Sequence, residues 1–103
     1  MKVFLIQQRK LEEIGKDRKI LSASIIRIDK KVWMPLFEVM TSTGETVTCS
    51  LRVQEREEVR TWADVRLLAE FLHKKLGIEE CRLVLKQWDS FQQSEPGETH
   101  GHF

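Results

Sequence analysis

Apolar and polar residues alternate most regularly in residues 46–53, near the middle of the chain. A period of two is typical of a β-strand, because successive side chains point to opposite faces of a sheet. The apolar set is Val47, Cys49, Leu51 and Val53. The polar set is Thr46, Thr48, Ser50 and Arg52. The pattern predicts a strand with one buried face and one open face.

Two further strands are expected before this one, at residues 20–28 and 32–41, which are rich in β-branched and aromatic residues. Pro35 interrupts the second of them and requires an edge position or a bulge. Charged residues separate the first two strands, and Gly44 supplies a position for positive φ between the last two. Together the three segments predict an antiparallel meander.

Residues 61–76 have the spacing of an amphipathic helix. Thr61 is the expected N-cap, Asp64 the acidic residue of a capping box, and Gly77 the residue that ends the helix. The apolar stripe consists of Trp62, Val65, Leu68, Ala69, Leu72 and Leu76. One stripe on one helix covers a single face of the sheet and leaves the other face open.

A fourth strand is expected at residues 81–88, parallel to the third because the crossover through the helix is right-handed. In a meander, strands one and three run in the same direction. The fourth strand can therefore also pair in parallel beside strand one. Residues 2–14 predict a helix ending near Gly15, and a strand over residues 2–7 is the alternative.

The expected fold class is therefore α+β: an antiparallel three-stranded meander plus a fourth strand, packed on one main helix, with an N-terminal helix. Its 103 residues suit a single domain, which we place at residues 1–89. Residues 90–103 are polar and contain proline and glycine, so we expect a disordered C-terminal tail.

The net charge and the cysteines limit which partners and which cellular compartment we expect for this protein. The formal net charge is +1, which gives no overall attraction to nucleic acid or anionic lipid. The two cysteines lack metal-ligand spacing, and free thiols in a cytoplasmic protein are the favoured interpretation. The short apolar run at the N-terminus is too short for a signal peptide or a membrane span, so no membrane partner is expected.

No arrangement of residues predicts catalysis. Cys49 belongs to the buried set of its strand, and His73 is an isolated residue on the predicted helix. Motifs of serine hydrolases, zinc peptidases and nucleotide-binding loops are absent. His100 and His102 provide only two ligands in the predicted tail. We therefore expect a non-enzymatic protein without cofactor or metal.

Large apolar residues beyond the needs of a one-helix core suggest a protein-interaction surface. The candidates are Trp33, Met34, Trp88 and Phe91. A free sheet edge would also allow pairing with another protein or with a second copy as a homodimer. The sequence thus predicts a small non-catalytic binding module that acts as a protein-interaction adaptor or regulator.

The alternative function is nucleic-acid binding through the open face of the sheet. Serine, threonine and basic side chains donate hydrogen bonds to phosphates and base edges. The candidates are Arg27, Lys30, Lys31, Thr48, Ser50 and Arg52. The same residue types also occur on any solvated strand face, and the abundant glutamates disfavour this alternative.

Overall fold

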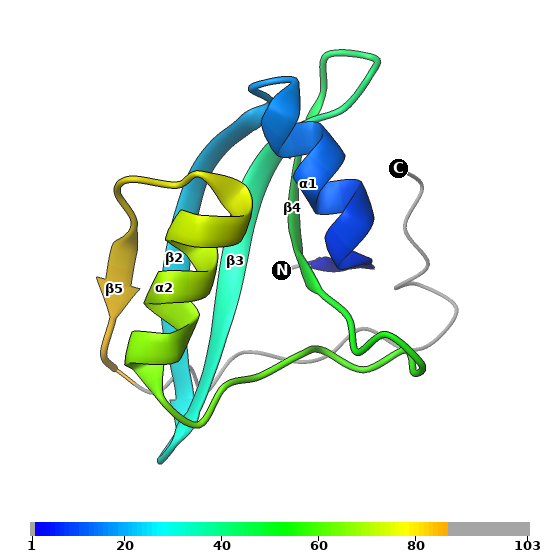
Figure 1. Ribbon diagram of the computed structural model, residues 1–103. Coiled ribbons are helices and arrows are strands. Elements are labelled where there is room, and N and C mark those ends of the chain that lie inside the picture. The colour runs from blue at the N-terminus through cyan, green and yellow to red at the C-terminus, as the bar shows by residue number, and fades with distance from the viewer. Residues whose placement is uncertain (1, 87–103) are drawn as a thin grey trace.

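The computed structural model describes residues 2–86 and has an α+β fold, with a five-stranded mixed sheet and two helices (Figure 1). The predicted tail, residues 90–103, lies outside the described residues. The sheet order is β1-β4-β3-β2-β5. The elements are β1 (Phe4–Ile6), α1 (Gln8–Lys16), β2 (Ile20–Asp29), β3 (Val32–Met40), β4 (Thr46–Leu51), α2 (Val65–Leu76) and β5 (Arg82–Val84).

The predicted meander forms the centre of the sheet, with β3 antiparallel to both β2 and β4. Lys31 adopts a positive φ of 53° in the turn before β3, and the carboxylate of Asp29 accepts the N–H of Lys30 at 2.7 Å. Gly44 has a φ of 86° in the second turn, as its position predicted. Local turn chemistry therefore fixes both hairpins.

Short parallel strands complete the sheet on both sides. β5 pairs in parallel with β2, which is the position beside the first meander strand that the sequence allowed for it. β1 pairs with β4, and α1 follows it directly. The prediction of a helix over residues 2–14 was therefore wrong for the first residues, because Phe4–Ile6 complete the sheet beside β4. The helix also continues through Gly15 to Lys16, and Arg18 takes the positive φ after it.

Both helices lie on the same face of the sheet, with α1 in front of β4 and α2 in front of β2 and β3 (Figure 1). Leu11 and Ile14 of α1 pack into the same buried cluster as Leu68 and Leu72 of α2. The sheet contributes Ile6, Ala23, Ile25, Phe37, Val39, Cys49 and Leu51 to this cluster. The core is therefore enclosed between the sheet and two helices, the apolar face of α2 and the shorter helix α1.

Helix α2 begins later than predicted. Its N-cap is Asp64, whose side chain accepts the backbone N–H of Arg66 at 2.9 Å, rather than Thr61. Trp62 is not helical, because its N–H and C=O pair with the backbone of Trp33. Gly77 ends the helix in the left-handed conformation, with a φ of 68°, as predicted.

Pro35 explains why Trp62 reaches the sheet. The ladder between β3 and β4 runs from Phe37 to Met40, and Pro35 has no N–H with which to continue it. Beyond this point residues 59–62 enter beside both strands: Arg60 donates its N–H to the carbonyl of Leu51 at 2.7 Å, and Trp33 donates to Trp62 at 2.9 Å. The connection between β4 and α2 thus supplies the backbone partners that the proline cannot.

Neither described helix is long and apolar enough to cross a membrane.

Candidate binding surfaces

Strand β5 forms one edge of the sheet, and its outer side has no strand partner among residues 2–86. Leu83, within this strand, is 50% exposed, and Leu85 just after it is 59% exposed. Both lie on the helix-covered side of the sheet, since Leu83 pairs with the core residue Ile25. They remain exposed because the buried positions of α2 face β2 and β3 rather than the outer edge of β5.

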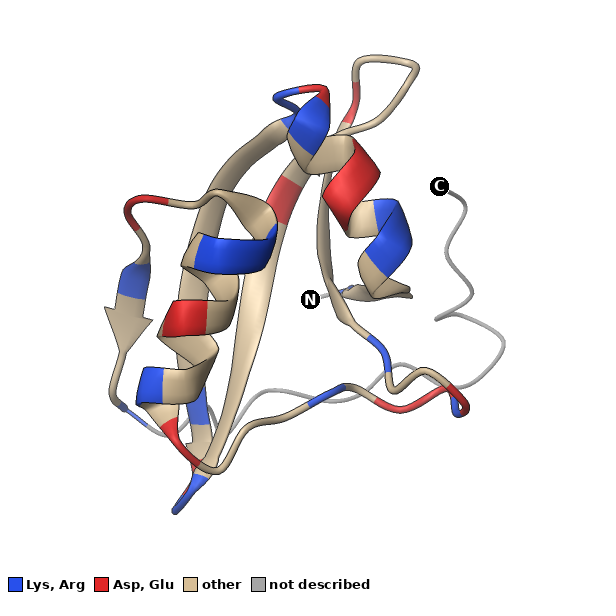
Figure 2. Cartoon of the chain, in the orientation of Figure 1, with Lys and Arg blue, Asp and Glu red and all other residues tan. Residues whose placement is uncertain are grey.

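Charged residues flank this edge strand on both sides. Figure 2 shows acidic residues in the turn before β5 and basic residues at its start and after its end. They are Glu79, Glu80, Arg82 and Lys86, all exposed. Within residues 2–86, none of these four forms an ion pair. The edge therefore carries an apolar centre between an acidic end and a basic end.

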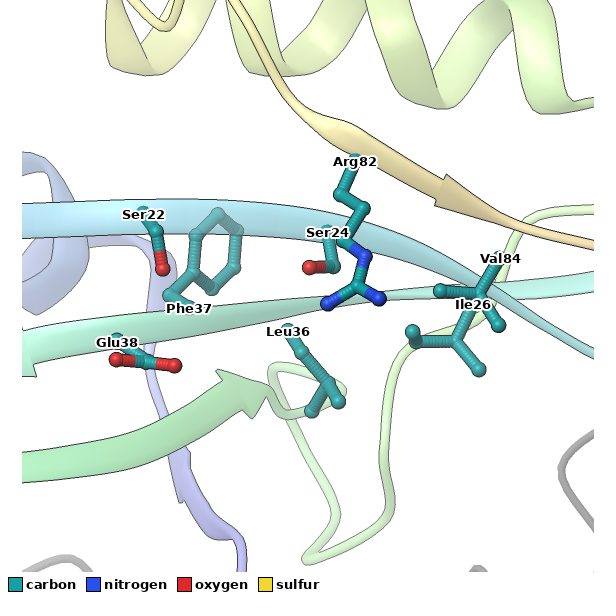
Figure 3. Close-up of a pocket in the computed structure, with 8 residues that line it drawn as sticks. All are labelled: Ser22, Ser24, Ile26, Leu36, Phe37, Glu38, Arg82 and Val84. Atoms are coloured by element: carbon teal, nitrogen blue, oxygen red, sulfur yellow. The ribbon is translucent and has the colours of Figure 1, made fainter.

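The face of the sheet opposite the helices holds a shallow depression with a volume of about 290 Å³. Arg82 extends from β5 across Ser24 toward Leu36 of β3, as Figure 3 shows. Glu38 lies at the far side of the depression, and Ile26 and Val84 form its apolar wall. Among the described residues, the lining of this depression mixes serine, charged and apolar side chains, with Arg82 as its basic residue.

Of the predicted protein-interaction residues the structure describes Trp33 and Met34, and these two do not form an exposed patch. Met34 is 0% exposed, and Trp33 is half-buried against the helix-covered core. The sequence did not reveal that Trp33 pairs with Trp62 through the backbone. Trp88 and Phe91 lie outside the described residues.

The residues predicted for nucleic-acid binding occupy several different places. Arg27 pairs across the sheet with Trp33, on the side that the helices cover, so its predicted position on the open face was wrong. Ser50 is fully buried, and its hydroxyl donates a hydrogen bond to the carbonyl of Pro35. Thr48 is half-buried on the open face.

The three remaining candidates lie at the ends of strands. Lys30 and Lys31 are exposed in the turn between β2 and β3. Arg52 follows β4 and is half-buried, with its Nε 3.4 Å from the carbonyl oxygen of Val53. The six candidates therefore form no single basic face.

Both cysteines are free, but their surroundings differ. Cys49 lies in the core as its alternation predicted, and burial raises the pKa of its thiol to about 12. Cys81 is exposed beside β5. His73 is exposed on α2, and the described part of the chain contains no group of three or more potential metal ligands.

Comparisons with known proteins identify no family for this chain. No protein-family model, no curated protein and no solved structure matches it.

Proposed function

We propose that the protein is a small non-catalytic binding module that acts as a protein-interaction adaptor or regulator, and that β5 is its binding edge. The observation that carries this proposal is the exposure of Leu83 and Leu85 at an edge with which no strand of residues 2–86 pairs. A free edge binds by adding a strand, because its unpaired N–H and C=O groups are a template for another chain. The occupant that fits this edge is a second copy of the chain.

The charge pattern of the segment supports self-pairing. Identical strands related by a twofold axis pair antiparallel, so a dyad at Leu83 places Leu83 opposite its own copy. With this register, Glu80 of each copy lies opposite Lys86 of the other. Leu85 meets Cys81 of the second copy on the same face as the leucine pair. The register therefore pairs Leu83 with Leu83 and Glu80 with Lys86, while Arg82 lies opposite Val84.

Charge reversal tests this arrangement. Glu80→Lys and Lys86→Glu each convert two attractive cross-strand pairs of the dimer into two repulsive pairs. Each lost attraction and each new repulsion counts about 0.2–1 kcal/mol, so either reversal should raise the dimer dissociation constant by about fourfold or more. The combined Glu80→Lys/Lys86→Glu variant reverses both partners and should restore the affinity. Sedimentation equilibrium of the full chain measures all four constants.

Lys75→Glu is the matched control. Lys75 is exposed on α2, so this substitution makes the same change of charge as Lys86→Glu at a position away from β5. It should leave the dissociation constant within about twofold of the parent value, since it is outside the paired segment. A chain that stays monomeric at high micromolar concentration contradicts the proposal. So does a dimer that neither single reversal weakens, or one that the combined variant fails to restore.

The nucleic-acid alternative has no comparable observation behind it, because its candidate residues do not converge. We therefore do not propose it.

A further inference from the structure

A polar cleft lies at the edge of the sheet farthest from β5. Strands β1 and β4 are parallel, so their carboxyl ends meet: Ile6 pairs with Leu51, and the N–H of Arg52 donates to the carbonyl of Ile6 at 3.0 Å. Helix α1 begins directly after β1, and the chain turns away after β4. Together they enclose a cleft of about 860 Å³. The carboxyl ends of parallel strands are a common location of ligand sites in other folds.

Three arginines from three different segments line this cleft. Arg9 comes from the first turn of α1, Arg52 follows β4, and Arg60 lies on the segment that returns to α2. Figure 2 shows basic positions on each of these segments. Since guanidinium groups are always charged and present several donors, this arrangement can hold an oxyanion from more than one side.

Arg60 is held in position by neighbouring side chains. Its Nη1 donates to Oε1 of Gln8 at 3.1 Å, and its Cζ lies 4.4 Å from the ring centroid of Trp62 and 5.1 Å from that of Phe71. A guanidinium has five N–H donors, and the hydrogen bond to Gln8 is the one that Arg60 makes through its side chain within residues 2–86. Its position is therefore set before any ligand binds, which lowers the entropic cost of binding.

The start of α1 adds donors to the same cleft. Gln7 precedes the helix without a capping hydrogen bond from its side chain, and the first turn contains no acidic residue. The first intrahelical bond runs from the N–H of Leu11 to the carbonyl of Gln7, so the preceding amides have no partner within the helix. The partial positive charge of this helix end reinforces the arginines.

Negative charge in the cleft is small by comparison. Glu12 is the single acidic residue among those that line it within residues 2–86, and its Oε2 accepts a hydrogen bond from Gln8 at 2.7 Å. In the same part of the chain, none of the three arginines has a carboxylate oxygen within 4 Å. Three cations thus face one anion in a concave site.

We propose that this cleft binds a small molecule that carries one or more phosphoryl groups. A phosphoryl group supplies the several acceptor oxygens and the charge of about −2 that three guanidinium groups and a helix N-terminus require. The volume is within the range of small-ligand sites. The proposal is independent of pairing through β5, because the two sites are at opposite edges of the sheet.

The test is a titration of the full chain with inorganic phosphate and pyrophosphate, followed by amide chemical shifts in NMR spectra. We expect saturable shifts at Gln8, Arg9, Lys10 and Arg52, with pyrophosphate binding tighter than phosphate. Arg52→Gln and Arg9→Gln should each weaken pyrophosphate binding by about tenfold, as the loss of a charge-assisted hydrogen bond predicts. Unchanged shifts elsewhere in each variant show that it is folded.

Lys16→Gln is the control, because it removes one positive charge from the other end of α1. Binding within about twofold of the parent protein is expected for this variant, since the charge is distant from the cleft. Shifts that do not saturate at millimolar pyrophosphate, or equal weakening by Lys16→Gln, overturn the proposal. A short single-stranded oligonucleotide that binds the same amides about a hundredfold more tightly than pyrophosphate would overturn it in favour of nucleic acid.

Discussion

At the scale of single residues, Ser50 shows how the chain compensates for Pro35. The proline carbonyl lies in the interior, where an unpaired acceptor costs about 1–3 kcal/mol, and the hydroxyl of Ser50 donates to it. The hydroxyl thus replaces a backbone donor at the point where the ladder between β3 and β4 ends.

Removing this hydroxyl should be costly. We expect Ser50→Ala to lower the free energy of unfolding by about 1–3 kcal/mol, because it leaves the carbonyl of Pro35 without this donor. Thr48→Ala is the control, since Thr48 is half-buried on the same strand and face and its side chain makes no hydrogen bond within residues 2–86. Urea denaturation measures both. Equal losses in the two variants would contradict the role given to Ser50.

The thiol of Cys49 predicts a specific dependence of stability on pH. Its pKa is raised from 9.0 to about 12 in the folded protein, because burial disfavours the thiolate. The unfolded chain therefore loses this proton first, and the thiol's contribution to stability, fully present below pH 9.0, is lost as pH rises toward about 12.

The measurement compares the parent protein with Cys49→Ala between about pH 8 and pH 11. The unfolding free energy of the parent should fall more steeply, with an additional slope that approaches ~1.4 kcal/mol per pH unit. Exposed Cys81 is present in both proteins and cancels in the comparison. Parallel pH profiles would show that Cys49 does not hold its proton as the structure indicates.

Residues with a strong local signal were predictable from the sequence. Gly44 and Gly77 adopt the positive φ that their positions predicted, and Cys49 occupies the core. Ser50 was not predictable in the same way, because its alternation with Cys49 assigns it to the open face. Its burial depends on Pro35, fifteen positions earlier, and no local pattern reports that contact.

At the scale of elements, α2 is held by its apolar stripe. Leu68→Ala should cost about 2–5 kcal/mol of unfolding free energy, because Leu68 is fully buried in the core cluster and leaves a cavity. Its neighbour Leu67 is 58% exposed, so Leu67→Ala makes the same change at a solvent-exposed position of the helix. Thermal and urea denaturation should show a small effect for Leu67→Ala, and similar losses would mean that the stripe is misplaced.

Element boundaries were less predictable than element types. The meander, α2 and the parallel fourth strand follow from hydrophobic period and turn chemistry. The start of α2 does not, because Trp62 fits the helical stripe but bonds to Trp33 in the sheet. Similarly, Phe4 has helical spacing with Leu11, yet it pairs with Cys49. In both cases a distant backbone partner outweighs the local pattern.

At the scale of the whole molecule, the stability of the sheet should decrease from the centre to the edges. β3 is paired on both sides at residues 37–39, whereas β1 and β5 are three-residue strands with one partner each among residues 2–86. Amide hydrogen exchange should therefore be slowest in residues 37–39 and fastest, among the strands, in residues 82–84. Protection of β5 should also increase with protein concentration if it pairs with a second copy. Uniform protection across the five strands would contradict this ordering.

The candidate binding surfaces were the least predictable feature. The sequence favoured tryptophans and Met34, whereas the exposed apolar side chains at the edge are Leu83 and Leu85. Exposure depends on which strand is last in the sheet, and strand order is a property of the whole fold rather than of any segment. The cleft near Arg9, Arg52 and Arg60 likewise exists only because β1 pairs with β4.

The parallel edges also impose an order on folding during synthesis. The three strands of the meander are consecutive, so β2, β3 and β4 can pair as soon as residue 51 has left the ribosome. β1 emerges first but must wait for β4, and β2 keeps an unpaired edge until α2 and then β5 have followed. Non-local pairings of this kind form slowly and leave strand edges exposed in the nascent chain. We therefore expect the sheet to form from its central strands outward. During translation the outer edge of β2 stays unpaired longest and is the edge at greatest risk of pairing with another chain.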